Sequence, residues 1–449
     1  MNETPAPLES TARRLVRRLR EAGFEAYYAG GCVRDMLLGQ APKDYDVATN
    51  AGPDDVQRIF PHHVAVGAHF GVIIVVESGH SIEVASFRSD GVYHDGRRPA
   101  SVTFTNARED AARRDFTVNG MFFDPLANDG AGEVIDYVGG RQDLADKILR
   151  AIGDPAARLA EDRLRLLRAV RFASQLDFQI EARTWEAVKA GAPEIHAISP
   201  ERIRDEMVKI FTTASRVRGW DLLDESGLMQ AVLPELEALK GCAQPPQFHP
   251  EGDVFVHTRL VLSQLPAHPI SVPLAFGALF HDIGKPACAK VNPDEGGRIR
   301  FNGHEHVGAE MTEKIMRRLR FSNDEIEATV EAVRQHMAFK DVRHMRVSTL
   351  KRFLARPGFE DELELHRADC LGSHFMLDNY DFLKAKREEF SSEPLIPKPF
   401  VTGRDLIELG MKPGPEFKSI LEAAQNRQLE GAFVDREAAL AWLRREYAR

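Results

Sequence analysis

Short apolar and alternating segments in the first 150 residues predict a small sheet. The expected strands are Ala26–Ala29, Tyr45–Ala48, Gly71–Glu77, Ser81–Arg88 and Val102–Thr105. Helical patterns occur between these segments, so helices and strands belong to one domain. We therefore predict that residues 1–150 form an α/β head built on one sheet.

Beyond residue 150, apolar residues recur at helical spacing. The clearest series consists of Leu159, Leu164, Leu167, Val170 and Phe172. Proline-rich breaks at 245–252 and 394–399 indicate domain boundaries. We predict a helical neck at 151–240, a helical third domain at 241–390 and a helical tail at 391–449. The expected fold class is a multidomain α+β protein with an α/β head.

The composition is that of an ordinary soluble protein, with 43% hydrophobic and 28% charged residues among 449. No apolar run is long enough to cross a bilayer, so we expect no membrane association. The scattered cysteines favour a reducing cytoplasm over a disulfide framework. A net charge of −9 argues against a nucleic-acid partner, but basic clusters at 163–171 and 343–352 can bind phosphates locally. The sequence gives no indication of the oligomeric state.

The segment 28–46 combines a glycine turn with two carboxylates. The first predicted strand stops at Gly30 and Gly31, a pair that suits a tight turn close to a ligand. Asp44 and Asp46 are two residues apart, so on a strand both carboxylates would project from one face. Paired oxygen ligands beside a helix N-terminus suit Mg²⁺ and a triphosphate. Two solvated turn aspartates are the alternative interpretation.

The run Gly-Gly-Cys-Val-Arg-Asp at 30–35, followed by Asp44 and Asp46, resembles the nucleotidyltransferase family of DNA polymerase β type. The closest branch is class II, which contains CCA-adding enzymes and bacterial poly(A) polymerases. The resemblance implies that Asp44 and Asp46 are catalytic ligands of Mg²⁺ and that Glu83 is the third carboxylate. A solvent-edge glutamate is the alternative for Glu83. The resemblance also implies that Gly30, Gly31 and Arg34 contact the nucleotide.

The segment 113–120 resembles the second motif of this family, with glycine where the family has alanine. The guanidinium groups of Arg113 and Arg114 can clamp a triphosphate. Asp115 and Asn119 can form hydrogen bonds with a ribose hydroxyl, which would select ribonucleotides. All four residues are therefore assigned to nucleotide binding.

The segment Glu161–Arg165 resembles the family's amino-acid template for the incoming base. Asp162 and Arg165 are three residues apart, so they are expected to share one helix face. A carboxylate accepts from an exocyclic amine while a guanidinium donates, a pattern that fits cytosine and adenine but not uracil and guanine. We expect Glu161 to orient this pair and Arg168 to contribute to nucleotide binding. A surface ion pair is the alternative.

A second group of potential metal ligands lies in the third domain. The adjacent residues His281 and Asp282 stand between apolar neighbours, which would bury charge unless a metal ion were bound. Imidazole with carboxylate suits transition metals such as Mn²⁺ or Ni²⁺ better than Mg²⁺. The order of these residues resembles the HD phosphohydrolase superfamily. It implies the ligands His257, His281, Asp282, His304, His336 and Asp369, with His306 competing with His304.

The resemblance covers almost the whole chain and implies a tRNA nucleotidyltransferase that adds CCA, or its terminal A, from CTP and ATP. The polar segment Ser89–Pro99 is predicted to be a mobile loop, and it resembles the family's flexible loop, which cytidine-only enzymes lack. One alternative is a poly(A) polymerase, which the run Val66–Gly71 disfavours because such enzymes tend to carry a Gly-Arg-Arg-Phe-type run there. Another is a phosphohydrolase whose head only binds RNA.

Overall fold

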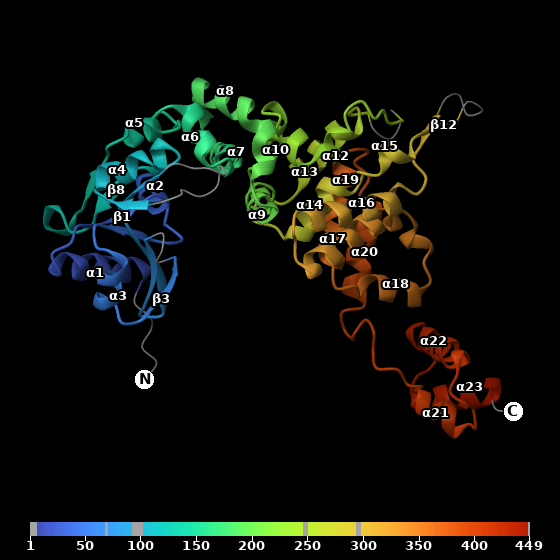
Figure 1. The fold of residues 1–449 in the computed structure, drawn as a ribbon. Coiled ribbons are helices and arrows are strands. Elements are labelled where there is room, and N and C mark those ends of the chain that lie inside the picture. Colours follow the sequence, from blue (N-terminus) through green and yellow to red (C-terminus); the bar gives the residue numbers. More distant parts are fainter. Residues whose placement is uncertain (1–6, 68–70, 92–101, 246–249, 293–297, 448–449) are drawn as a thin grey trace. The chain divides into compact units, whose positions relative to one another are not determined.

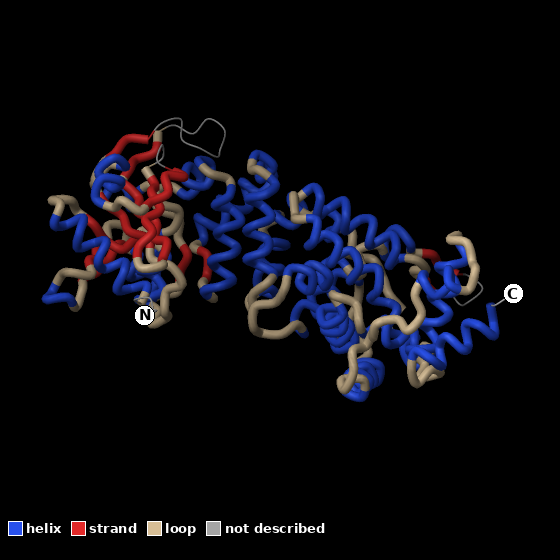
Figure 2. Tube along the Cα trace, turned by 90° about the horizontal axis from the view of Figure 1, so that it is seen from below, coloured by secondary structure: helices blue, strands red, loops and turns tan. Residues whose placement is uncertain are grey.

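The computed structural model describes residues 7–67, 71–91, 102–245, 250–292 and 298–447. The chain divides into two compact units, Met1–Pro234 and Glu235–Arg449 (Figure 1). Figure 2 shows that strands gather in the head, whereas helices make up most of the remaining chain. Among the described residues, no helix has both the length and the apolar character needed to cross a membrane.

The head is built on a seven-stranded sheet with the order β3-β4-β5-β2-β1-β8-β9. Its central strand β2 (Asp46–Thr49) pairs antiparallel with β1 (Ala26–Ala29) and parallel with β5 (His80–Ser86). The outer strands are β3 (His63–Gly67), β4 (Val72–Glu77), β8 (Phe122–Asp124) and β9 (Glu133–Ile135). Strands β1, β2, β4 and β5 lie where the alternation predicted them, which confirms the α/β head.

A separate hairpin pairs β6 (Arg88–Asp90) with β7 (Val102–Phe104). Ser89 and Asp90 therefore lie in a strand and not in the loop expected at Ser89–Pro99. The remainder of that loop falls largely outside the described residues.

The head also contains helices. They are α1 (Leu8–Glu21), α2 (Gly31–Leu37), α3 (Pro53–Ile59), α4 (Ala107–Ala112) and α5 (Gly140–Ala145), with 3-10 turns η2 (Thr117–Asn119) and η3 (Asn128–Gly130). Helix α1 is amphipathic and buries Leu15, Val16 and Leu19 completely. Its apolar stripe covers part of the sheet, because α1 contacts β1, β2 and β5.

The neck is helical, as predicted. Its helices are α6 (Pro155–Glu161), α7 (Leu164–Leu176), α8 (Ala182–Gly191), η4 (Ala192–Ala197), α9 (Pro200–Phe211), α10 (Arg216–Glu225) and α11 (Leu228–Val232). The side chain of Asp154 caps α6 by accepting a hydrogen bond from the Ala157 amide. A short parallel pair, β10 (Ile148–Leu149) with β11 (Gln179–Ile180), ties the neck to the last strand of the head region.

The second unit is also helical. It contains α12 (Pro234–Glu237) at the division, then α13 (Val254–Gln264), α14 (Val272–Phe280), α15 (Lys285–Cys288), α16 (His304–Arg318), α17 (Asn323–Gln335), η6 (His336–His344), α18 (Val347–Leu354), α19 (Phe359–Leu371) and α20 (Asp378–Glu389). The hairpin β12 (Lys290–Asn292) with β13 (Arg298–Arg300) interrupts the helices. The tail consists of α21 (Gly403–Glu408), α22 (Pro415–Leu429) and α23 (Arg436–Tyr447).

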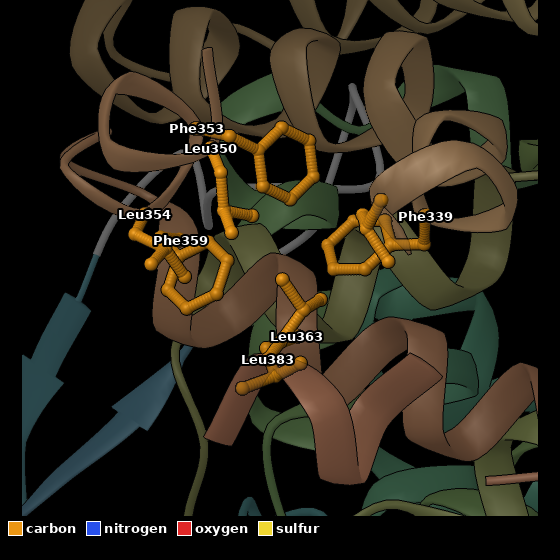
Figure 3. Packing of buried hydrophobic residues seen from close by; sticks show 8 residues of the cluster. Phe339, Leu350, Phe353, Leu354, Phe359, Leu363 and Leu383 are labelled. Atoms are coloured by element: carbon orange, nitrogen blue, oxygen red, sulfur yellow. The ribbon is translucent and has the colours of Figure 1, made fainter. Parts of the chain in front are cut away.

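An aromatic cluster joins η6, α18, α19 and α20 (Figure 3). The ring of Phe353 packs edge-on against Phe339 at 5.0 Å and against Phe359 at 5.8 Å between centroids. Such pairs add to the free energy gained by burying the rings. The cluster thereby holds η6, which begins at His336, against α19, which carries Asp369.

Replacing Phe353 by Ala should lower the free energy of unfolding by about 3–5 kcal/mol, because it removes two ring contacts and leaves a cavity. Urea denaturation of the full chain measures this change. The control is Phe375→Ala, since the Phe375 side chain is 71% exposed. Equal stability of the two variants would show that the cluster does not support this unit.

Candidate functional site

The glycine turn after β1 brings a helix N-terminus close to basic side chains. Gly30 has φ +74° and ψ −129°, a backbone conformation that suits glycine alone. A Cβ atom at this position would lie 2.9 Å from Nη1 of Arg114. Helix α2 starts directly after the turn, at Gly31. The turn therefore places free backbone N–H groups beside Arg114, an arrangement that suits an anion.

Three carboxylates interact at the central strands of the head sheet. Asp46 begins β2, and Glu83 lies in the neighbouring strand β5. Asp44 is exposed and precedes β2, so strand geometry does not by itself place its carboxylate on the same face as that of Asp46. Burial, followed by the charges of Glu83 and Asp44, raises the pKa of Asp46 to about 6, although Arg114 opposes this. Such an excess of negative charge fits a divalent cation.

The two arginines of the second motif share one buried carboxylate. Arg113 Nη2 lies 2.7 Å from Oδ1 of Asp110, and Arg114 Nη2 lies 3.0 Å from Oδ2. Burial alone would raise the pKa of Asp110, but Arg114 and Arg113 lower it below its usual value. Asp110 was missed in the sequence, where its spacing of three and four residues from Arg113 and Arg114, just beyond the end of α4, was the available signal. It fixes both guanidinium groups in the head.

The remaining nucleotide-binding candidates of the head form a buried network with the neck. Arg34 Nη1 donates to Asn119 Oδ1 at 2.7 Å, and Asn119 Nδ2 donates to Asp115 Oδ1 at 3.3 Å. Arg168 Nε of helix α7 donates to the other oxygen of Asp115 at 2.8 Å. Burial would raise the pKa of Asp115, but Arg168 and Arg165 lower it to about 2. The structure thus brings together residues from the glycine motif, the second motif and the neck.

Glycine at position 120, the departure from the family motif, has a packing reason. A Cβ atom there would lie 2.8 Å from Cγ2 of Val138 and 3.0 Å from Cδ1 of Ile152. These contacts are tighter than van der Waals packing allows, so the local packing accommodates glycine in place of alanine.

Asp162 and Arg165 do not share a helix face, contrary to the prediction. Helix α6 ends at Glu161, Asp162 has extended backbone angles, and α7 begins at Leu164. Arg165 Nη1 lies 2.6 Å from Oε2 of Glu161, whereas Asp162 Oδ2 lies 2.7 Å from Nη2 of Arg202. Each side chain is therefore held by its own partner at the break between two helices. Arg202, on α9, gave no signal in the sequence.

Asp282 lies at the centre of the candidate metal ligands in the second unit. His281 Nε2 is 3.3 Å from Oδ2 of Asp282, while Nε2 of His304 and His336 are 3.2 and 3.7 Å from Oδ1. Among the described residues, the groups able to hold an ion are His257 with His281 and Asp282, and Asp282 with His304 and His336. The head carboxylates do not approach one another this closely.

The sequence also predicts Asp369 and His306 as candidate ligands. Asp369 Oδ1 lies 3.1 Å from Nε2 of His257, on the side of the first group. His306 is 70% exposed and faces Glu305, so His304 and not His306 belongs to the cluster. Gly284 permits the close approach of α16, since a Cβ atom there would lie 2.3 Å from the carbonyl oxygen of His304.

The histidine rings are oriented for metal binding. In His281, His304 and His336, the Nδ1 atom faces a backbone carbonyl, which fixes the proton on Nδ1; the carbonyls are those of Ala278 at 2.9 Å, Phe301 at 2.8 Å and Val333 at 2.6 Å. The lone pairs of Nε2 of His304 and His336 then face each other at 3.1 Å, and Nε2 of His257 lies 3.2 Å from Nε2 of His281. Facing lone pairs repel unless a cation lies between them, so the donor set fits metal ions.

A cavity of about 700 Å³ adjoins these ligands. Asp282, His304, His336 and Asp369 form part of its wall. Three cationic side chains also line it, those of Lys285, Arg300 and Lys340. The cavity therefore combines candidate metal ligands with positive charge, the combination that an anionic ligand requires.

Comparisons with known protein families match each part of the chain. The profile of the Poly A polymerase head domain matches residues 26–150. The probable RNA- and SrmB-binding site of polymerase A matches residues 177–240, and the HD domain matches residues 254–370. The chain thus combines a region that matches the Poly A polymerase head domain with a region that matches the HD domain.

Several proteins similar to this chain are CCA-adding enzymes. A CCA-adding enzyme of Geobacillus thermodenitrificans is 44% identical over 215 residues, which is 48% of this chain and 52% of the relative. The chain therefore matches about half the length of such curated relatives. A Bacillus stearothermophilus CCA-adding enzyme, solved in complex with CTP, is 26% identical with a TM-score of 0.74 over 98% of both chains. The Thermotoga maritima CCA-adding enzyme solved with tRNA has the same fold, with a TM-score of 0.60 at 19% identity and 98% and 96% coverage.

The chain therefore matches a Poly A polymerase head domain and an HD domain, and it is similar to CCA-adding enzymes.

The protein should bind transition-metal ions such as Mn²⁺ or Ni²⁺ through its HD domain. Replacing His304 by Ala should remove one ion per chain, because it deletes a buried ligand beside Asp282. Elemental analysis after gel filtration measures the metal content. The exposed neighbour His306, replaced by Ala, is the control and should retain the wild-type content. Equal metal content in all three proteins would exclude His304 as a ligand.

Proposed function

We propose that this protein is a cytoplasmic tRNA nucleotidyltransferase that adds CCA, or its terminal A, to tRNA 3′ ends from CTP and ATP. The observation that carries this proposal is the concentration of negative charge at Asp46 beside Glu83 and Asp44. It lies in the same unit as a glycine turn and a buried network of arginines and amides. Likeness to a CCA-adding enzyme in complex with CTP, over nearly the whole chain, supports the choice of reaction.

The head supplies binding and orientation for this reaction. Mg²⁺ held by Asp44, Asp46 and Glu83 would activate the attacking 3′-hydroxyl and stabilise the leaving pyrophosphate. Arg113 and Arg114, held by Asp110, have further N–H groups with which to contact the triphosphate. The N-terminus of α2 adds backbone N–H groups to the same anion.

The network around Asp115 provides recognition of the sugar. Asn119 and Asp115 are held by Arg34 and Arg168, respectively, so their remaining polar atoms have defined directions. Hydrogen bonds to a ribose hydroxyl from such preorganised groups cost little further entropy. We assign Gly30, Gly31, Arg34 and Arg168 to nucleotide binding together with this pair.

Base selection is assigned to Asp162 and Arg165. Glu161 holds Arg165 and Arg202 holds Asp162, so both side chains are fixed although they do not share a helix. The carboxylate would accept from the exocyclic amine of cytosine or adenine, and the guanidinium would donate to the adjacent acceptor. This arrangement excludes uracil and guanine.

A second function is proposed for the HD domain, namely the hydrolysis of phosphate esters or 2′,3′-cyclic phosphates. The observation in its favour is the cavity that places Lys285, Arg300 and Lys340 beside His304, His336, Asp282 and Asp369. Mn²⁺ or Ni²⁺ bound by the HD ligands would activate water for attack on phosphorus. The cationic side chains would bind the phosphate oxygens.

Replacing Asp46 by Asn should lower nucleotide addition by on the order of 10²- to 10³-fold, because one charged contact to the reacting centre is lost. The assay offers labelled CTP or ATP with tRNA that ends before CCA, after CC, or with complete CCA. Asp54→Asn changes an exposed aspartate of the same head and is the control. Wild-type rates in Asp46→Asn would contradict the assigned active site. Extension of complete CCA by many adenosines would identify a poly(A) polymerase instead.

Replacing Arg165 by Ala should raise the share of UMP or GMP incorporated, because Arg165 would read the base and not the phosphates. The expected change in base discrimination is about 1–3 kcal/mol, or roughly five- to 150-fold. Single-nucleotide incorporation with each of the four substrates measures it. The control is Arg163→Ala, since Arg163 pairs with Glu194 instead. An equal loss with every nucleotide would assign Arg165 a structural role.

A further inference from the structure

His257 differs from the other histidines of the HD cluster in the partner of its Nδ1 atom. The other three face backbone carbonyls, whereas Nδ1 of His257 lies 2.8 Å from Oε1 of Glu251. The side chain of Glu251 is 8% exposed and that of His257 is 0% exposed. Burying a carboxylate costs free energy unless its charge is paired, so we expect Glu251 to have a role beyond packing.

The backbone around Glu251 is held in place. Glu251 lies in the turn that precedes α13, a segment that the sequence marked only as a proline-rich break. The side chain of Asp253 accepts from the amides of Val256 at 3.0 Å and Gly241 at 2.7 Å. These bonds fasten the turn to α13 and to the preceding segment. This turn therefore holds the Glu251 carboxylate next to His257.

The two metal-binding groups consequently have different surroundings. In the first group, Nε2 of His257 faces His281 at 3.2 Å and Asp369 at 3.1 Å, and Glu251 stands behind the His257 ring. In the second group, Nδ1 of His304 and Nδ1 of His336 each donate to a backbone carbonyl. A carboxylate behind an imidazole makes its free nitrogen a stronger ligand than a carbonyl does.

We propose that Glu251 is a positioning residue that strengthens metal binding at the His257 position and makes the two metal positions of the HD domain unequal. This inference rests on the proposed metal-binding role of the HD domain. Glu251 holds the proton on Nδ1 of His257, directs the lone pair of Nε2 toward the cluster and raises its basicity through its negative charge. It does not itself reach the ion.

The chain offers a matched control in Glu305. Its Oε2 atom lies 3.5 Å from Nδ1 of His304, which is beyond good hydrogen-bond geometry. The carbonyl of Phe301 already accepts from this Nδ1 atom at 2.8 Å. Glu251→Gln and Glu305→Gln thus make the same substitution beside the same atom of two different ligands, and only the first removes an engaged carboxylate.

The experiment is a titration of the metal-free full-length protein with Mn²⁺, measured by calorimetry, together with the visible absorption spectrum after titration with Co²⁺. Glu251→Gln should raise the dissociation constant of one of two bound ions by about 10–100-fold and leave that of the other ion unchanged. Glu305→Gln should leave both unchanged. Glutamine has the size of glutamate and can still accept from Nδ1, so a role in packing alone predicts wild-type affinities for Glu251→Gln.

Two further variants make the test independent of folding defects. Glu251→Asp keeps the charge but is shorter, so it should weaken the same ion less than Glu251→Gln does. In a His257→Ala background, Glu251→Gln should cause no additional loss, because its effect passes through His257. Circular dichroism of each metal-free protein checks the fold.

The possible outcomes separate this inference from the proposed function. Wild-type affinities in Glu251→Gln, or equal weakening of both ions, would overturn the role of Glu251 while leaving the HD metal site intact. A wild-type protein that binds neither Mn²⁺ nor Co²⁺ would overturn the metal-binding role itself, and the inference with it.

Discussion

The contact between Asp115 and Arg168 is the interaction on which the nucleotide site depends. Asp115 belongs to the head and Arg168 to neck helix α7, and Arg168 Nε donates to the buried Asp115 carboxylate at 2.8 Å, while the Arg168 side chain is 32% exposed. Through Asn119 the same carboxylate reaches Arg34 next to the glycine turn. Burying the Asp115 carboxylate without a cationic partner would be costly, so this pair fixes its orientation. The site therefore combines residues of the head with a residue of the neck, and no single motif contains all of them.

Both candidate sites bring several potential metal ligands close together. At the head, burial and the charges of Glu83 and Asp44 raise the pKa of Asp46 to about 6. In the HD domain, paired imidazole nitrogens face each other at 3.1 and 3.2 Å. The ligand types differ, with carboxylates alone at the first site and imidazoles with carboxylates at the second. Carboxylates alone suit hard cations, whereas imidazoles with carboxylates suit borderline ones.

Much of the fold was predictable because the relevant signals are local. Alternation identified β1, β2, β4 and β5, and helical periodicity identified the neck. Strands β3, β8 and β9 were not expected, since segments of three to five residues at the sheet edges carry little pattern. The expected shared helix of Asp162 and Arg165 failed because the chain breaks between α6 and α7, a change that spacing alone does not reveal.

The motifs alone predicted the classes of candidate site residues and the resemblance to CCA-adding enzymes, because such chemistry needs particular side chains at short spacings. The partners that hold those side chains were decided only by the tertiary structure. Asp110 could have been suspected from its spacing on α4, but Arg202 comes from α9 and Glu251 from a turn that the sequence marked as a break. Whether His304 or His306 joins the HD cluster was likewise settled by burial. A polar contact between distant segments depends on how the helices pack, and that information is spread over the whole core.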